Sequence, residues 1–113
     1  MPVKLNYVIK FVDDMNRAIE FYRDVLGFPL KFESPGWSEF TTGETTLALH
    51  VASPENPANS MQLGFQVPDV DAFHADMKAR GIKFTMPPTE QFGARLARFV
   101  DSEGAECLVA PQM

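Results

Sequence analysis

The chain lacks several features that would assign it to a class at once. It has one cysteine, Cys107, so no disulfide can form within a chain, and a reducing compartment is favoured. No apolar run approaches the roughly 20 residues that span a bilayer, and the start, MPVKLN, has no signal-peptide pattern. The Lys and Arg residues are scattered and the net charge is -5, which disfavours nucleic acid as a partner. These absences indicate a cytoplasmic protein that does not contact a membrane.

What the chain has in quantity is phenylalanine, 10 residues among 113. So many large apolar side chains must fill a core, a subunit interface or a pocket. The length suits one domain, or two small halves that share a core.

The sequence contains a repeat. Val12 and Asp14 match Val67 and Asp69, and both stretches run through a helical pattern to a glycine. The pattern predicts a single domain, residues 1–113, of two modules, 1–52 and 61–113. The proline-containing segment 53–60, SPENPANS, is the expected linker.

Each half reads as strand, helix, strand, strand, strand. In the first half these are expected over 5–12, 15–26, 28–33, 37–41 and 46–52. In the second half strands are expected over 61–67, 82–86, 96–100 and 106–110, with a helix between Asp69 and Gly81. Pro87 and Pro88 are expected to open a loop that runs to about Gly93. The fold class predicted is α+β, with two βαβββ modules whose helices lie outside curved mixed sheets.

Three motifs carry a resemblance to a known family. FVDDMNRAIEFYRDVLGF is similar to the N-terminal signature of the vicinal oxygen chelate superfamily, which includes glyoxalase I, extradiol dioxygenases and bleomycin resistance proteins. VPDVDAFHADMKARGIKF resembles it more loosely, and RFVDSEGAECLV resembles the closing hairpin, with Ser102 where proline is usual. The resemblance implies the fold strongly and the reaction weakly, because one scaffold supports many chemistries.

The resemblance also says where metal ligands would lie, on the first and last strands of each module. These positions hold Tyr7, Ala48, Gln62 and Leu108. Alanine and leucine have no donor atom, neutral tyrosine is a poor ligand for Zn²⁺, Ni²⁺ or Mn²⁺, and glutamine alone cannot hold an ion. A shift in strand register could bring in only His50. We therefore expect no metal and no cofactor.

Alternation along the strands predicts the residues that line a cleft, formed within one chain or across a homodimer. Tyr7 could anchor a ligand or fill the volume of the missing metal, and Trp37 could stack on a planar ligand or pack at a dimer contact. His50 could be a general base, paired with Glu39, or a half-buried histidine bonded to a neighbour. Arg95 could bind an anionic group or lie in solvent. The predicted ligand-binding residues are Tyr7, Trp37, Glu39, Ala48, His50, Gln62, Glu106 and Leu108.

These residues leave two functions open. The first is metal-independent binding of a small molecule, as in the drug-sequestering members of the superfamily. The second is an enzyme, an isomerase, lyase or glyoxalase-like protein, that uses His50 with Glu39, Tyr7 or Glu106 for proton transfer. A structural or regulatory protein without a ligand is a third, weaker reading.

Overall fold

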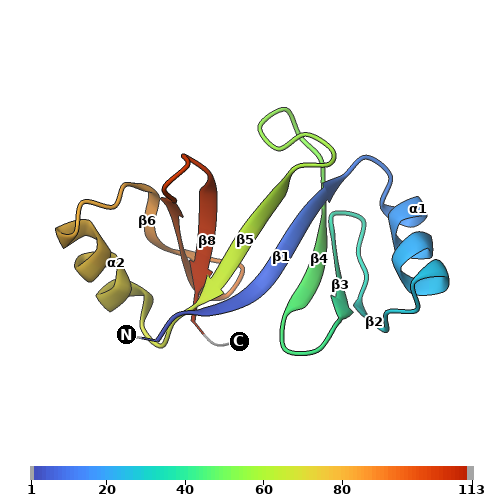
Figure 1. Cartoon of the computed structure of the whole chain (residues 1–113), viewed down its shortest axis with the longest axis horizontal. Helices are drawn as coiled ribbons and strands as arrows, with labels where there is room; N and C mark the ends of the chain where they lie inside the picture. The colour runs from blue at the N-terminus through green and yellow to red at the C-terminus, as the bar shows by residue number, and fades with distance from the viewer. Residues whose placement is uncertain (1, 112–113) are drawn as a thin grey trace. The chain divides into compact units, whose positions relative to one another are not determined.

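The computed structural model describes residues 2–111 and divides into two units, each built from strand, helix and three further strands (Figure 1). The first unit spans Asn6–Met61, and the second takes up Gln62 onwards with the residues before Asn6. The expected α+β class and the βαβββ order are confirmed. No helix in the described part of the chain is long and apolar enough to cross a membrane.

The first unit holds a four-stranded mixed sheet with the order β2-β3-β4-β1. Its strands are β1 (Lys4–Val12, which starts just before the unit), β2 (Leu30–Phe32), β3 (Trp37–Thr41) and β4 (Thr46–Val51). β1 pairs with β4 in parallel, and β3 pairs antiparallel with both β4 and β2. One face of this sheet packs on the helix through Val12, Ile19, Phe40 and Leu49.

The helix of the first unit begins as the sequence predicts and ends differently. Asp14 caps α1 (Met15–Glu20) by accepting a hydrogen bond from the Arg17 amide at 3.0 Å. The chain then widens into a π-helical turn, η1 (Phe21–Val25), where the Leu26 amide donates to the Phe21 carbonyl. Gly27 ends the helix at φ +80°, the left-handed conformation that glycine adopts without strain.

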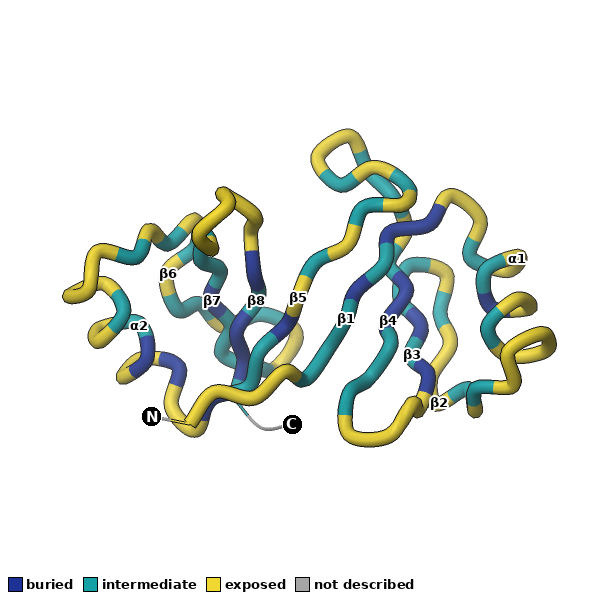
Figure 2. Tube along the Cα trace, viewed as in Figure 1, coloured by how far each residue is buried: buried dark blue, intermediate teal, exposed yellow. Residues whose placement is uncertain are grey.

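The second unit has the order β5-β8-β7-β6 in its sheet. Its elements are β5 (Met61–Gln66), α2 (Val70–Ala79), β6 (Phe84–Gln91), β7 (Ala94–Val100) and β8 (Glu106–Ala110). Asp69 caps α2 through the Ala72 amide at 3.0 Å, and Val70 and Phe73 pack on Val109 of the sheet. In both units the buried residues gather on the central strands and on the helix faces toward them (Figure 2).

Two strand predictions are wrong in their extent. The loop expected from Pro87 to Gly93 is largely strand, because β6 continues to Gln91. The prolines fall where the register with β7 shifts, between Met86 and Thr89, and β6 is the last strand in its order, so their missing N–H groups interrupt no further ladder. The strand expected over 28–33 is only Leu30–Phe32, because Pro29 contributes a carbonyl alone, accepting from the Thr41 amide.

Candidate functional site

One face of the first unit's sheet carries five of the predicted site residues: Tyr7, Trp37, Glu39, Ala48 and His50. Glu39 and Ile9 are cross-strand neighbours of Ala48, and Trp37 and Phe11 are neighbours of His50, while Tyr7 faces Thr46. Residues paired across strands point to the same side of a sheet. The opposite side carries Phe40 and Leu49, which pack on the helix. We call Tyr7, Phe11, Trp37, Glu39 and His50 the aromatic face.

Rings on this face meet edge to face. The Trp37 ring centroid lies 6.0 Å from that of Tyr7 and 5.9 Å from that of His50, both in T-shaped contact. His50 also lies 5.2 Å from Phe11. Each ring contacts its neighbours, so the face is a mostly apolar surface with a few polar atoms.

Glu39 orients the indole ring of Trp37. Its Oε2 accepts a hydrogen bond from the indole Nε1–H at 2.7 Å, and its Oε1 lies 3.5 Å from the Lys31 ammonium. The Glu39 side chain is only 16% exposed. Within residues 2–111 no hydrogen bond joins Glu39 to His50, so the acid–base pair considered from the sequence is not formed. Trp37 contacts both residues instead.

Tyr7 and His50 are the polar groups of this face that a ligand could use. Burial, and secondly the negative charge of Glu39, raise the pKa of the Tyr7 hydroxyl above its ordinary value, so it stays a protonated donor at neutral pH. His50 Nδ1 lies 2.7 Å from the Val51 carbonyl, which can only accept, so Nδ1 carries the hydrogen. That tautomer leaves Nε2 of a neutral ring as a hydrogen-bond acceptor.

In the second unit, Glu106 is held by two donors. Gln62 Nε2 donates to its Oε1 at 3.3 Å, and Thr85 Oγ1 donates to its Oε2 at 2.6 Å. Leu108 follows Glu106 on the same face of β8, and its cross-strand partners are Gly64 of β5 and Arg98 of β7. The structure thus brings Gln62 and Glu106 together and adds Thr85, which the sequence analysis did not single out.

The donor set at the four expected ligand positions does not suit a divalent ion. In the first unit, Ala48 is fully buried and has no donor, and Tyr7 keeps its proton. In the second unit, Gln62 offers a single neutral oxygen, since its Nε2 donates to Glu106, and Leu108 is apolar. Across residues 2–111, no three His, Cys, Asp or Glu side chains gather in a way that could hold a metal ion.

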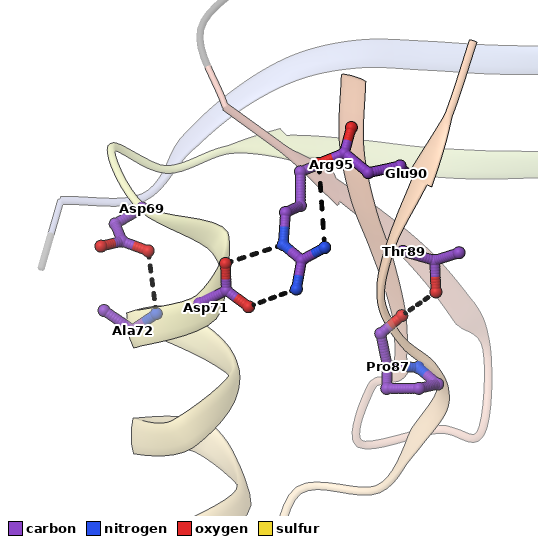
Figure 3. Close-up of polar contacts among 7 residues, drawn as sticks. All are labelled: Asp69, Asp71, Ala72, Pro87, Thr89, Glu90 and Arg95. Atoms are coloured by element: carbon purple, nitrogen blue, oxygen red, sulfur yellow. Dashed lines mark hydrogen bonds and ion pairs between the residues drawn. The ribbon is translucent and has the colours of Figure 1, made fainter. Parts of the chain in front are cut away.

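The two half-buried arginines of β7 have different environments. Arg95 forms a bidentate ion pair with Asp71 of α2 at 2.8 and 2.9 Å and a longer one with Glu90 at 3.8 Å (Figure 3). This pair raises the pKa of Arg95 and lowers that of Asp71. Arg95 is therefore engaged by carboxylates rather than free for a ligand.

Sequence reasoning missed Arg98 as a site residue. Arg98 is the cross-strand partner of Leu108, so it shares the face that carries Leu108 and Glu106. The signal in the sequence is the turn over Asp101–Ala105, which sets the register of the last hairpin and so pairs Arg98 with Leu108.

A separate hollow lies on the helix side of the first unit. It has a volume of about 380 Å³ and lies between α1 and the segment around Ala58–Asn59. Side chains of both charges line this hollow: the cations Lys10 and Arg17 and the carboxylates Asp13 and Asp14. None of the predicted site residues contributes to it.

Comparison with known proteins agrees with this architecture. Residues 4–107 match the family model described as the glyoxalase/bleomycin resistance protein/dioxygenase superfamily. The uncharacterized protein YraH of Bacillus subtilis (strain 168) is 30% identical over an alignment of 118 positions, gaps included, that covers 89% of this chain and 92% of that protein.

Solved structures share the fold at low sequence identity. A hypothetical protein from Bacillus halodurans C-125 superposes with a TM-score of 0.82 at 16% identity, over 100% of this chain and 96% of that one. A Streptomyces coelicolor methylmalonyl-CoA epimerase in complex with 2-nitronate-propionyl-CoA gives 0.75 at 21% identity, over 96% of both chains. The family match, the repeated βαβββ unit and the signature motifs together establish that the chain belongs to the glyoxalase/bleomycin resistance protein/dioxygenase superfamily.

Proposed function

We propose that this protein binds a small organic molecule on the aromatic face of its first unit, without a divalent metal. The observation that carries the proposal is the lack of ionic donor atoms at the first unit's ligand positions, beside aromatic rings that pack on one another. Ala48 contributes no donor, and Tyr7 contributes a protonated hydroxyl packed against Trp37. Neither group suits an ion, and a protonated hydroxyl beside an aromatic ring suits an organic ligand.

Two polar atoms and one aromatic ring support specific binding. The Tyr7 hydroxyl can donate, His50 Nε2 can accept, and the Trp37 ring offers an apolar surface that Glu39 keeps in place. The indole N–H is already bonded to Glu39, so Trp37 would contribute stacking rather than a hydrogen bond. The ligand best suited to this face has a planar apolar part and at least one oxygen or nitrogen.

The test uses the fact that Trp37 is the only tryptophan. The aromatic dye 8-anilinonaphthalene-1-sulfonate would be titrated into the protein while Trp37 fluorescence is followed, with and without EDTA. We expect saturable quenching that EDTA does not alter, and purified protein with less than one equivalent of divalent metal. Stoichiometric metal, or binding that EDTA abolishes, would overturn the proposal.

A matched pair of variants shows where the dye binds, read from its own emission. Trp37→Leu removes the proposed stacking surface, and we expect several-fold weaker dye binding, in line with about 1 kcal/mol for an aromatic contact. Phe92→Ser removes an aromatic ring that is 99% exposed and lies in the other unit. Equal weakening by both changes would indicate nonspecific dye binding.

One observation favours an enzymatic alternative. The hydrogen on His50 Nδ1 leaves the lone pair on Nε2, the form a general base requires. The structural likeness to methylmalonyl-CoA epimerases makes proton exchange next to a thioester carbonyl the reaction to test. Glu39 is a poor partner for His50 because its two oxygens already serve Trp37 and Lys31.

The alternative is tested by NMR in D₂O with methylmalonyl-CoA. Exchange of the hydrogen next to the carbonyl by the wild type and by His74→Gln, but not by His50→Gln, would support catalysis. His74 is the second of the two histidines and lies on α2, so it is the matched control. No exchange by the wild type, with dye binding retained, would leave the binding function alone.

We also propose that the protein forms a homodimer. Phe21, Val25 and Leu26 are 48%, 69% and 50% exposed at the end of the first helix, an unusual amount of apolar surface for one turn. Light scattering at micromolar concentration should give twice the mass of one 12.6 kDa chain. A single-chain mass would contradict the proposal.

A further inference from the structure

We infer that Arg98 anchors the carboxylate of a small organic anion on the sheet face of the second unit. This inference rests on contacts within the second unit, so it does not depend on the aromatic face or on the absence of a metal.

The first step is the lack of an anionic partner for a half-buried cation. Among residues 2–111, no carboxylate lies within ion-pair distance of the Arg98 guanidinium. Its recorded contact is Met86 Sδ, 3.8 Å from Nη1, and a thioether is a weak acceptor. The guanidinium has five N–H donors, one of which meets a weak acceptor, and the others remain accessible to a ligand.

Arg95 shows that another arginine of this sheet does have carboxylate partners. Arg95 lies on the same strand, is also half-buried, and is engaged by Asp71 and Glu90. Arg17 also has no recorded carboxylate partner, but it is exposed, where water serves its donors at no cost. Arg98 is thus the half-buried arginine whose donors are left for a partner outside the described chain.

The second step is the chemistry of the surroundings. Leu108 and Met86 are the cross-strand neighbours of Arg98. Both are apolar, and they favour an organic tail beside the charged head. Glu106 is on the same face, but its two oxygens accept from Gln62 and Thr85, so it stays fixed and is not drawn to Arg98.

The third step chooses the anion. A planar guanidinium binds a carboxylate through two parallel hydrogen bonds, which matches one charge to one charge. A phosphate carries more charge, and a single arginine near Glu106 in a chain of net charge -5 would compensate it poorly. A monocarboxylate with an apolar substituent fits these neighbours best.

The experiment is an NMR titration of ¹⁵N-labelled protein with sodium benzoate, compared with sodium phosphate and sodium chloride at equal ionic strength. We expect saturable shifts of the Arg98 Nε–H signal and of the Leu108 and Met86 amides with benzoate. Phosphate and chloride should give smaller shifts that do not saturate. Saturation by phosphate at the same concentration would overturn the choice of a carboxylate.

Matched variants locate the site. Arg98→Met keeps an apolar stem and removes the charge, and we expect at least tenfold weaker benzoate binding. Arg95→Met removes the same charge from the same strand and should leave benzoate binding within twofold. Benzoate binding unchanged in Arg98→Met, or shifts centred on Arg95 and Asp71, would overturn the inference. If Arg98→Met does not fold, the Arg98 Nε–H signal of the wild type still decides the matter.

Discussion

Glu39→Ala is expected to destabilise the first unit by an amount that the structure lets us estimate. The change removes the 2.7 Å hydrogen bond from the Trp37 indole and leaves that N–H without its acceptor in a half-buried place. The loss of a charged acceptor costs about 2 kcal/mol, within a range of about 1–3. The Lys31 contact adds little, because at 3.5 Å and with Lys31 53% exposed it is worth about 0–1 kcal/mol.

Two further variants separate these contributions. Glu39→Gln keeps an oxygen that can accept from the indole and loses only the charge, so we expect a loss of about 1 kcal/mol. Lys31→Ala removes the ammonium and keeps the indole bond, so we expect a loss below about 0.5 kcal/mol. The predicted order of destabilisation is therefore Glu39→Ala, then Glu39→Gln, then Lys31→Ala.

Urea unfolding followed by Trp37 fluorescence is the assay, since the single tryptophan reports on the first unit. With a slope of about 2 kcal/mol per M, Glu39→Ala should lower the midpoint by about 1 M. A midpoint equal to that of Lys31→Ala would refute the reasoning, because the indole bond would then contribute nothing measurable. An unchanged emission maximum in folded Glu39→Ala would likewise count against Glu39 as the group that orients the indole.

Three other predictions follow from the structure. The raised pKa of Tyr7 means that its contribution to stability is fully present below about pH 10 and is lost as pH rises through the higher folded value; Tyr7→Phe should flatten the alkaline fall in the free energy of unfolding. The lowered pKa of Asp71 works in the opposite direction, so its contribution is present above about pH 4 and lost on further acidification; in acid titrations, Asp71→Asn should lose less stability than the wild type between pH 5 and 2. Phe92 has φ +52° in the turn before Gly93 and is 99% exposed, so Phe92→Asn should raise the thermal midpoint, with a gain of about 0.5–1 kcal/mol; a lower midpoint would show that the ring has a packing role.

The parts of the fold that the sequence predicted are those determined by local signals. Asp14 and Asp69 cap the helices, and Gly27 and Gly81 end them in the left-handed conformation, because each signal acts within one helical turn. The assignment of strand faces also followed from alternation alone. It placed Ala48 and His50 on one side of the sheet, opposite Leu49, whereas the pairing of Trp37 with His50 across strands is seen only in the structure.

The parts that were missed depend on neighbours distant in the sequence or on side-chain conformation. The strand through Pro87 and Pro88 forms because β6 is an edge, which no local pattern reveals. The bond between Glu39 and Trp37, in place of a pair with His50, depends on rotamers. Arg98 was overlooked because its lack of a carboxylate partner is visible only when Asp71 and Glu90 are seen to reach Arg95.

The prolines of β6 have a consequence for how copies of this chain meet. β6 stands at one end of the strand order of the second unit and β2 at one end of that of the first, and the edge of a sheet is a template on which another chain can extend the ladder. Two adjacent residues without N–H groups spoil that template in β6, and β2 is only three residues long. Growth by strand addition is therefore disfavoured at both strands, and we expect the proposed homodimer to form through side-chain surfaces and to close instead of growing into a fibre.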